Sequence, residues 1–189
     1  LKSSSTARNF LQAEPERFLY AIMAKKKKVR QSAFADNSTA AWGIQATHVL
    51  ESKFKGKGVR IAVLDTGIDT AHPDLKTIIS AKRSFITGQQ VIDLNGHGTH
   101  CAGLIAGNTH ATRKFRYGVA PEARLYIGKV LSNEGVGTDS SILAGIEWAL
   151  QQKCQLISMS LGGAAMPGDP YSTVYEAVDG KEALDKFLI

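Results

Sequence analysis

A run of mainly aliphatic residues, Val59–Leu64, is preceded by Gly58 and followed by Asp65. Its β-branched content and its flanking residues are typical of a strand buried on both faces of a parallel sheet. Further strands are predicted over 125–131 and 156–160. Between them, apolar residues over 140–151 recur at helical spacing, and a helix is also predicted over 97–106. Strands that alternate with helices predict an α/β fold with a parallel sheet between helices.

Asp65 and His97 are the candidate catalytic residues. Ligand sites in open parallel sheets lie at the carboxyl ends of the strands, where Asp65 is placed, and His97 begins a helix at the same edge. A carboxylate that accepts the Nδ1–H of an imidazole fixes its tautomer and leaves Nε2 free to act as a base. The alternative is that Asp65 caps a turn and His97 caps a helix.

Five ordered motifs make this chain similar to the subtilisin-like serine peptidases, the subtilases. They are the aspartate box 65–69 with its continuation 72–75, the histidine box 97–103, the turn 118–121, the strand 125–131 and the segment 158–163. The resemblance runs from about residue 56 to 175. It implies a three-layer subtilisin-like fold, incomplete at the C-terminus, in which Asp65 orients His97 and His97 acts as general base and then general acid.

Two segments resemble those that sandwich an extended peptide in subtilases. They contain Gly135, Val136 and Gly137 in the first, and Ser160, Leu161, Gly162 and Gly163 in the second. Glycine lacks a Cβ, so another backbone can approach it for strand-like hydrogen bonds. The resemblance therefore implies a peptide or protein substrate in extended conformation. The alternative is that these glycines serve only turns.

The third member of the expected triad is missing from the 189 residues. Subtilases place their nucleophile in a later Gly-Thr-Ser-x-Ala motif, which does not occur here. Ser160 falls in the substrate segment, and Ser140 and Ser141 begin a predicted helix. We therefore expect a serine endopeptidase fragment that is inactive alone. The rival hypothesis is a peptide-binding module without catalysis, and a weaker one is a basic adaptor that uses Lys25–Lys28.

Residues 1–55 differ in composition from residues 56–189, which carry all the family motifs. The resemblance suggests that 1–55 hold a propeptide remnant and a lead-in segment, so the chain's own propeptide is a candidate partner. No nucleic-acid partner is expected, because the lysine run lacks interleaved aromatic residues. No membrane partner is expected either, since Phe18–Ala24 is too short to span a bilayer. Resemblance alone suggests a secreted or extracytoplasmic protein.

We expect no metal and no cofactor. His97 and His100 have the spacing of a ligand pair, but a third ligand and a general-base glutamate are lacking. Asp74 resembles a calcium ligand of the family, yet the loop 108–117 carries three positive charges, which predict no calcium at that site. Cys101 and Cys154 are expected to be free thiols, with Cys101 packed beneath the imidazole of His97.

Overall fold

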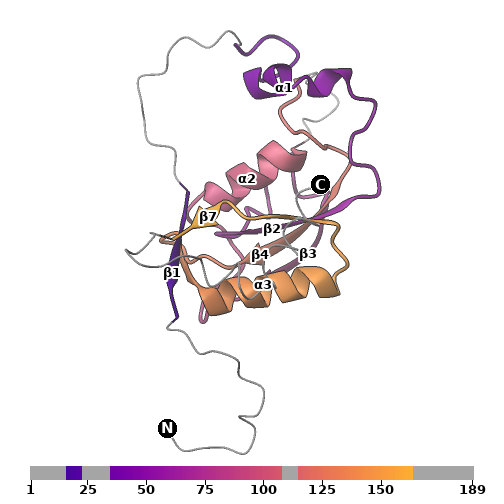
Figure 1. The fold of residues 1–189 in the computed structure, drawn as a ribbon. Coiled ribbons are helices and arrows are strands. Elements are labelled where there is room, and N and C mark those ends of the chain that lie inside the picture. The colour runs from indigo at the N-terminus through magenta and orange to yellow at the C-terminus, as the bar shows by residue number, and fades with distance from the viewer. Residues whose placement is uncertain (1–15, 23–34, 108–114, 164–189) are drawn as a thin grey trace, which may run out of the picture.

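The structure is a computed structural model that describes residues 16–22, 35–107 and 115–163 (Figure 1). Within these residues the elements follow in the order β1 Phe18–Ala21, α1 Trp42–Ala46, the 3-10 helix η2 Val49–Glu51, β2 Arg60–Asp65, β3 Ile79–Ser84, α2 His97–Ala106, β4 Arg124–Lys129, β5 Val136–Thr138, α3 Asp139–Gln151, β6 Leu156–Ser158 and β7 Leu161–Gly162.

The main sheet has the strand order β3-β4-β2-β6, and every pair of neighbours is parallel. Five of the six residues of the central strand β2 are buried, as its sequence predicts. In the register of β2 with β4, Asp65 lies opposite Lys129, so both strands end at the same edge. This arrangement confirms the predicted α/β class with a parallel sheet.

Helices α2 and α3 cover opposite faces of this sheet, which gives three layers (Figure 1). On one face Ala102 and Ala106 of α2 pack with Ile61, Val63 and Ile127. On the other face Ile142 and Ile146 of α3 pack with Ala62, Leu64 and Val130. The alternation of side chains along β2 therefore sends successive residues into two separate cores.

Four strands lie outside the predicted pattern. β3 is an edge strand whose residues are exposed or only partly buried, so it lacks an apolar run. β1, β5 and β7 form a second sheet in which β1 is the middle strand and is antiparallel to both neighbours. The predicted strand 156–160 ends early, at Ser158, and the chain then enters β7.

Both predicted helices are present. α2 spans the predicted residues, and α3 begins one residue earlier than expected, with Thr138 as its N-cap and a capping box to Ser141. None of the helices in the described part of the chain is both long and apolar enough to cross a membrane.

Candidate active site

Asp65 is held in a tight turn at the end of β2. Its side chain is buried, and Oδ1 accepts a hydrogen bond from the backbone N–H of Thr66 at 2.7 Å. The turn continues through Gly67, whose φ of 114° favours glycine. A Cβ on Gly98 would collide with the carbonyl oxygen of Gly67, so the absence of a side chain lets the start of α2 approach the turn.

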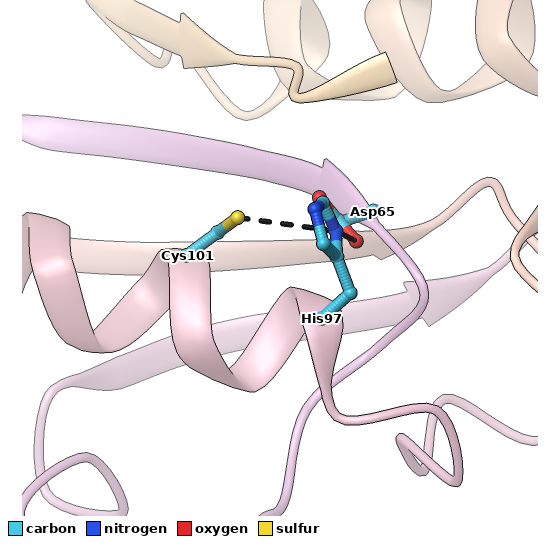
Figure 2. Close-up of side chains that lie close together, drawn as sticks. All are labelled: Asp65, His97 and Cys101. Carbon is cyan, nitrogen blue, oxygen red and sulfur yellow. Dashed lines mark hydrogen bonds and ion pairs between the residues drawn. The ribbon is translucent and has the colours of Figure 1, made fainter. Parts of the chain in front are cut away.

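His97 is the first residue of α2, and its Nδ1 lies 2.7 Å from Oδ1 of Asp65 (Figure 2). The imidazole donates from Nδ1 and the carboxylate accepts. Nε2 then points away from the carboxylate and lies 3.1 Å from the carbonyl oxygen of Ile22. The two sequence candidates are therefore in contact, and their geometry matches what a carboxylate-oriented base needs.

The surroundings of His97 raise the pKa of its imidazole. Burial disfavours the imidazolium, but the hydrogen bond to Asp65 and the charge of Asp65 outweigh burial and raise the pKa of His97 above its ordinary value. The carbonyl of Ile22 and the charge of Asp93 add to this rise. The site thus stabilises the imidazolium that a general base forms when it removes a proton.

Asp93 fixes the position of α2 and was missed by the sequence analysis. Its Oδ2 accepts from the N–H of Thr99 at 2.8 Å, and its Oδ1 accepts from the N–H of Gly96 at 2.8 Å. Thr66 donates its hydroxyl to Asp93 at 2.9 Å and accepts from the N–H of Gly98, which joins the Asp65 turn to the helix. Burial opposes ionisation of Asp93, but these hydrogen bonds prevail and lower its pKa. An aspartate shortly before a helix start is the signal that could have identified it.

Cys101 lies one helical turn after His97, and its Sγ is 3.9 Å from Nδ1 of His97 (Figure 2). Both Cys101 and Cys154 are free thiols, as expected. Burial is the main cause that raises the pKa of the Cys101 thiol. The neutral thiol is therefore favoured, and Cys101 does not resemble an activated nucleophile.

Asp65, His97 and Cys101 place one potential ligand atom each within 4.8 Å of one another. The carboxylate and the imidazole are already hydrogen-bonded to each other, so we assign no metal to this group. His100 is exposed and lies outside the group.

The two predicted substrate segments flank strand β1. Val136 and Gly137 of β5 pair with Tyr20 and Leu19, and Gly135 accepts from the N–H of Ala21 at 2.9 Å. On the other side, Leu161 and Gly162 of β7 pair with Ala21 and Tyr20. The carbonyl of Ser160 accepts from the N–H of Ile22 at 3.0 Å. A Cβ on Gly163 would lie 3.6 Å from the carbonyl oxygen of Phe18. We call the space between β5 and β7 the strand site.

The occupant of the strand site is this chain's own segment 16–22, which the sequence analysis did not place there. Leu19 is only 7% exposed and joins the core beneath α3, whereas Phe18 and Tyr20 are exposed. At the start of the segment, the Glu16 carboxylate accepts from the N–H of Ser140 at the beginning of α3. Hydrogen bonds from Ser140, and then Thr138, lower the pKa of Glu16. One buried side chain and one helix-capping carboxylate thus anchor the segment.

Asp74, the residue that resembles a calcium ligand, faces a phenol. The hydroxyl of Tyr117 donates to Oδ2 of Asp74 at 2.9 Å, and the Tyr117 ring lies against Gly107 at the end of α2. Burial, followed by this hydrogen bond and the charge of Asp74, raises the pKa of Tyr117 well above its ordinary value. A neutral donor therefore pairs with one of the two carboxylate oxygens of Asp74. Most of the loop 108–117 lies outside the described residues, and the absence of calcium stays a prediction.

Tyr117→Phe should lower the free energy of unfolding by about 1.5–3 kcal/mol, because a half-buried carboxylate loses its donor. Urea denaturation measures this loss. Tyr126→Phe is the matched control, since the Tyr126 ring packs on Trp148 and its loss of a hydroxyl leaves Asp74 untouched. Calcium that restores the stability of Tyr117→Phe would contradict our account of Asp74.

Fold and site together define an α/β protein that holds a histidine on a buried carboxylate beside a strand site. A model of the subtilase family matches residues 56–188, and the chain belongs to this family of serine peptidases. It is 46% identical to subtilisin DY of Bacillus licheniformis over 121 residues, which are 64% of this chain and 43% of that protein. It is 48% identical to the major intracellular serine protease of Bacillus subtilis (strain 168), over 64% of this chain and 39% of that one.

A more distant relative is the cuticle-degrading protease of Metarhizium anisopliae, 36% identical over 75% of this chain and 38% of that protein. The chain thus spans less than half the length of each of these relatives. One of them is named an intracellular protease, so family membership assigns no compartment to this chain.

Proposed function

We propose that this chain supplies the aspartate and the histidine of a serine endopeptidase that cleaves extended peptides. The observation that carries the proposal is the 2.7 Å contact between His97 Nδ1 and Asp65 Oδ1, with Nε2 turned toward the backbone of a bound strand. Asp65 orients the imidazole, and Nε2 takes the proton of the serine hydroxyl and later gives it to the leaving amine. The serine comes from a family motif that the 189 residues do not contain.

Gly135, Val136, Gly137, Ser160, Leu161, Gly162 and Gly163 bind the substrate in this proposal, mainly through their backbone. The segment 16–22 supports it, because it is bound between two strands by main-chain hydrogen bonds, as in strand addition by a peptide. Side chains that alternate between buried and exposed along β1 indicate that recognition depends on every second residue of the peptide.

The same contacts support the proposal that residues 1–55 form an N-terminal extension, part of which acts as a propeptide, ahead of a peptidase domain over 56–189. Segment 16–22 covers Nε2 of His97 and fills the strand site, so it blocks other peptides while it stays there. Lys25–Lys28, on which the basic-adaptor hypothesis rests, lie outside the described residues.

The competing function is peptide binding without catalysis. The occupied strand site favours it as much as it favours a peptidase, because main-chain pairing alone needs no nucleophile. In that case the Asp65–His97 contact serves only to hold α2 against β2.

Fluorophosphonate labelling distinguishes the two functions. The protein is expressed with the coding sequence that follows the Ile189 codon in frame, and the 189-residue chain is the comparison. A peptidase becomes labelled on one serine beyond residue 189, the label depends on His97, and the 189-residue chain stays unlabelled. A folded longer product that binds peptides but takes no label, or a stop codon directly after Ile189, overturns the peptidase proposal in favour of peptide binding.

A further inference from the structure

Lys129 is a fully buried lysine at the carboxyl end of β4. It lies opposite Asp65 in the register of β2 with β4, so its backbone is directly beside that of the candidate catalytic aspartate. Burial of an ammonium group is costly unless it is paired and hydrogen-bonded, and a methionine or leucine would fill the same space without this cost. A lysine here therefore calls for an explanation beyond packing.

The Nζ of Lys129 joins two segments of the site. It donates to the carbonyl oxygen of Thr66, in the turn directly after Asp65, and to Oδ1 of Asn133 at 2.9 Å. Burial lowers the pKa of Lys129, and the charges of Asp93, Glu134 and Asp65 act against this lowering. Three carboxylates from three different segments thus favour the charged form.

Asn133 carries the connection to both the histidine and the strand site. Its carbonyl oxygen accepts a hydrogen bond from Nδ2 of Asn95 at 3.0 Å, and Asn95 lies two residues before His97 in the sequence. Its own N–H donates to Oε1 of Gln89 at 3.1 Å, which fixes the loop from the other side. Two residues further on, Gly135 accepts the backbone hydrogen bond from Ala21 of the bound strand.

We propose that Lys129 is a positioning residue that couples the Asp65 turn to the peptide-binding edge of the strand site. The inference rests on the proposed function, since it assigns Lys129 to the triad and substrate segments of that function. One buried cation holds the backbone after Asp65 and the loop that leads into β5. Lys129 therefore sets the charge environment of Asp65, the carboxylate that orients His97, and the position of the Gly135 carbonyl that the bound strand uses.

Two readouts on the full 189-residue chain test this coupling. NMR titration gives the pKa of His97, and hydrogen exchange gives the protection of the Ala21 amide. In Lys129→Met, Asp65 loses the cation that interacts with its charge, which raises the pKa of His97. The released loop also makes Ala21 exchange about tenfold faster, the equivalent of one hydrogen bond. Lys82→Met on the neighbouring strand β3 is the matched control, because Lys82 is exposed, and it leaves both readouts unchanged.

Asn133→Ala keeps the ammonium group of Lys129 and removes only its hydrogen bond to the Asn133 side chain. This variant tests the proposal if Lys129→Met does not fold. It should accelerate exchange at Ala21 and leave the pKa of His97 in place. A purely structural lysine would lower the free energy of unfolding without moving either readout in the folded protein. If either readout of folded Lys129→Met, or the Ala21 exchange of Asn133→Ala, matches the wild type, the proposal is wrong. Neither readout uses hydrolysis, so a failure of the proposed function would be seen separately, in the labelling experiment.

Discussion

Replacing His97 with alanine is expected to lower kcat about 10⁶-fold, and Asp65→Asn about 10⁴-fold, in the protein expressed with its serine-bearing segment. These are the magnitudes known for the corresponding residues of subtilisin, a relative of this chain. His97→Ala removes the base itself. Asp65→Asn keeps the shape of the site but replaces the carboxylate that accepts from Nδ1 at 2.7 Å.

The pH dependence of activity distinguishes the role of His97 as the base from the role of Asp65 as the carboxylate that raises its pKa. Because Asp65 raises the pKa of His97, the free enzyme gains activity with pH as His97 loses its proton, and the midpoint lies above the ordinary value of histidine. The stabilising effect of this pair is present at low pH and is lost as pH rises through the raised pKa. In Asp65→Asn the midpoint should move down. Steady-state kinetics on a quenched peptide measure both effects.

Asp69→Asn is the control for the second variant, since it makes the same chemical change at an exposed position four residues away. It should retain kcat. Activity of Asp65→Asn equal to that of Asp69→Asn would show that Asp65 only stabilises the turn.

Leu19→Asp should lower the equilibrium constant for docking of segment 16–22 in the strand site about 100-fold. Burial of a leucine contributes about 1.5–3 kcal/mol, and an unpaired carboxylate in the same place adds a further cost. Hydrogen exchange at the amides of Ala21 and Ile22 is the measurement, because both donate across the strand site. Their protection factors should fall in proportion to this equilibrium constant.

Tyr20→Asp is the matched control, because Tyr20 is 49% exposed and occupies the next position in the same strand. Protection of the Ala21 and Ile22 amides should persist in this variant. Equal loss in both variants would argue that general strand propensity, rather than the buried Leu19 side chain, holds the segment. Unchanged protection in Leu19→Asp would contradict the register of β1.

Much of the main sheet could be predicted because its signals are local. The apolar run 59–64 and the helical spacing over 140–151 correspond to β2 and α3, whose side chains enter the two cores. β3 could not be found in this way, since an edge strand with partly exposed residues has no apolar pattern. β1 is stabilised by distant partners on β5 and β7, and its own sequence gives no sign of them.

The site shows the same division between local and distant determinants. Asp65 and His97 could be proposed from motifs, because the strand end and the helix start bring them to one edge. Lys129 could not, since its role depends on contacts with Thr66 and Asn133 that form only in the folded chain. Asp93 lies shortly before a helix start, which is a local signal, but its contacts with Thr66 and Thr99 also form only in the folded chain. The sequence places segment 16–22 within a possible propeptide remnant, and Phe18–Ala24 is too short for a membrane span. Its place between β5 and β7 could not be predicted, because its apolar residues suit burial by any neighbour.

Cleavage-site mapping tests the central claim most directly. A peptide that covers residues 16–26 is incubated with the protein expressed with its downstream coding sequence, and mass spectrometry identifies the products. Since Nε2 of His97 lies 3.1 Å from the carbonyl oxygen of Ile22, we predict one cut, between Ile22 and Met23, that disappears in His97→Ala. A folded protein that binds this peptide and leaves it intact would contradict the assignment of Asp65 and His97 to a peptidase.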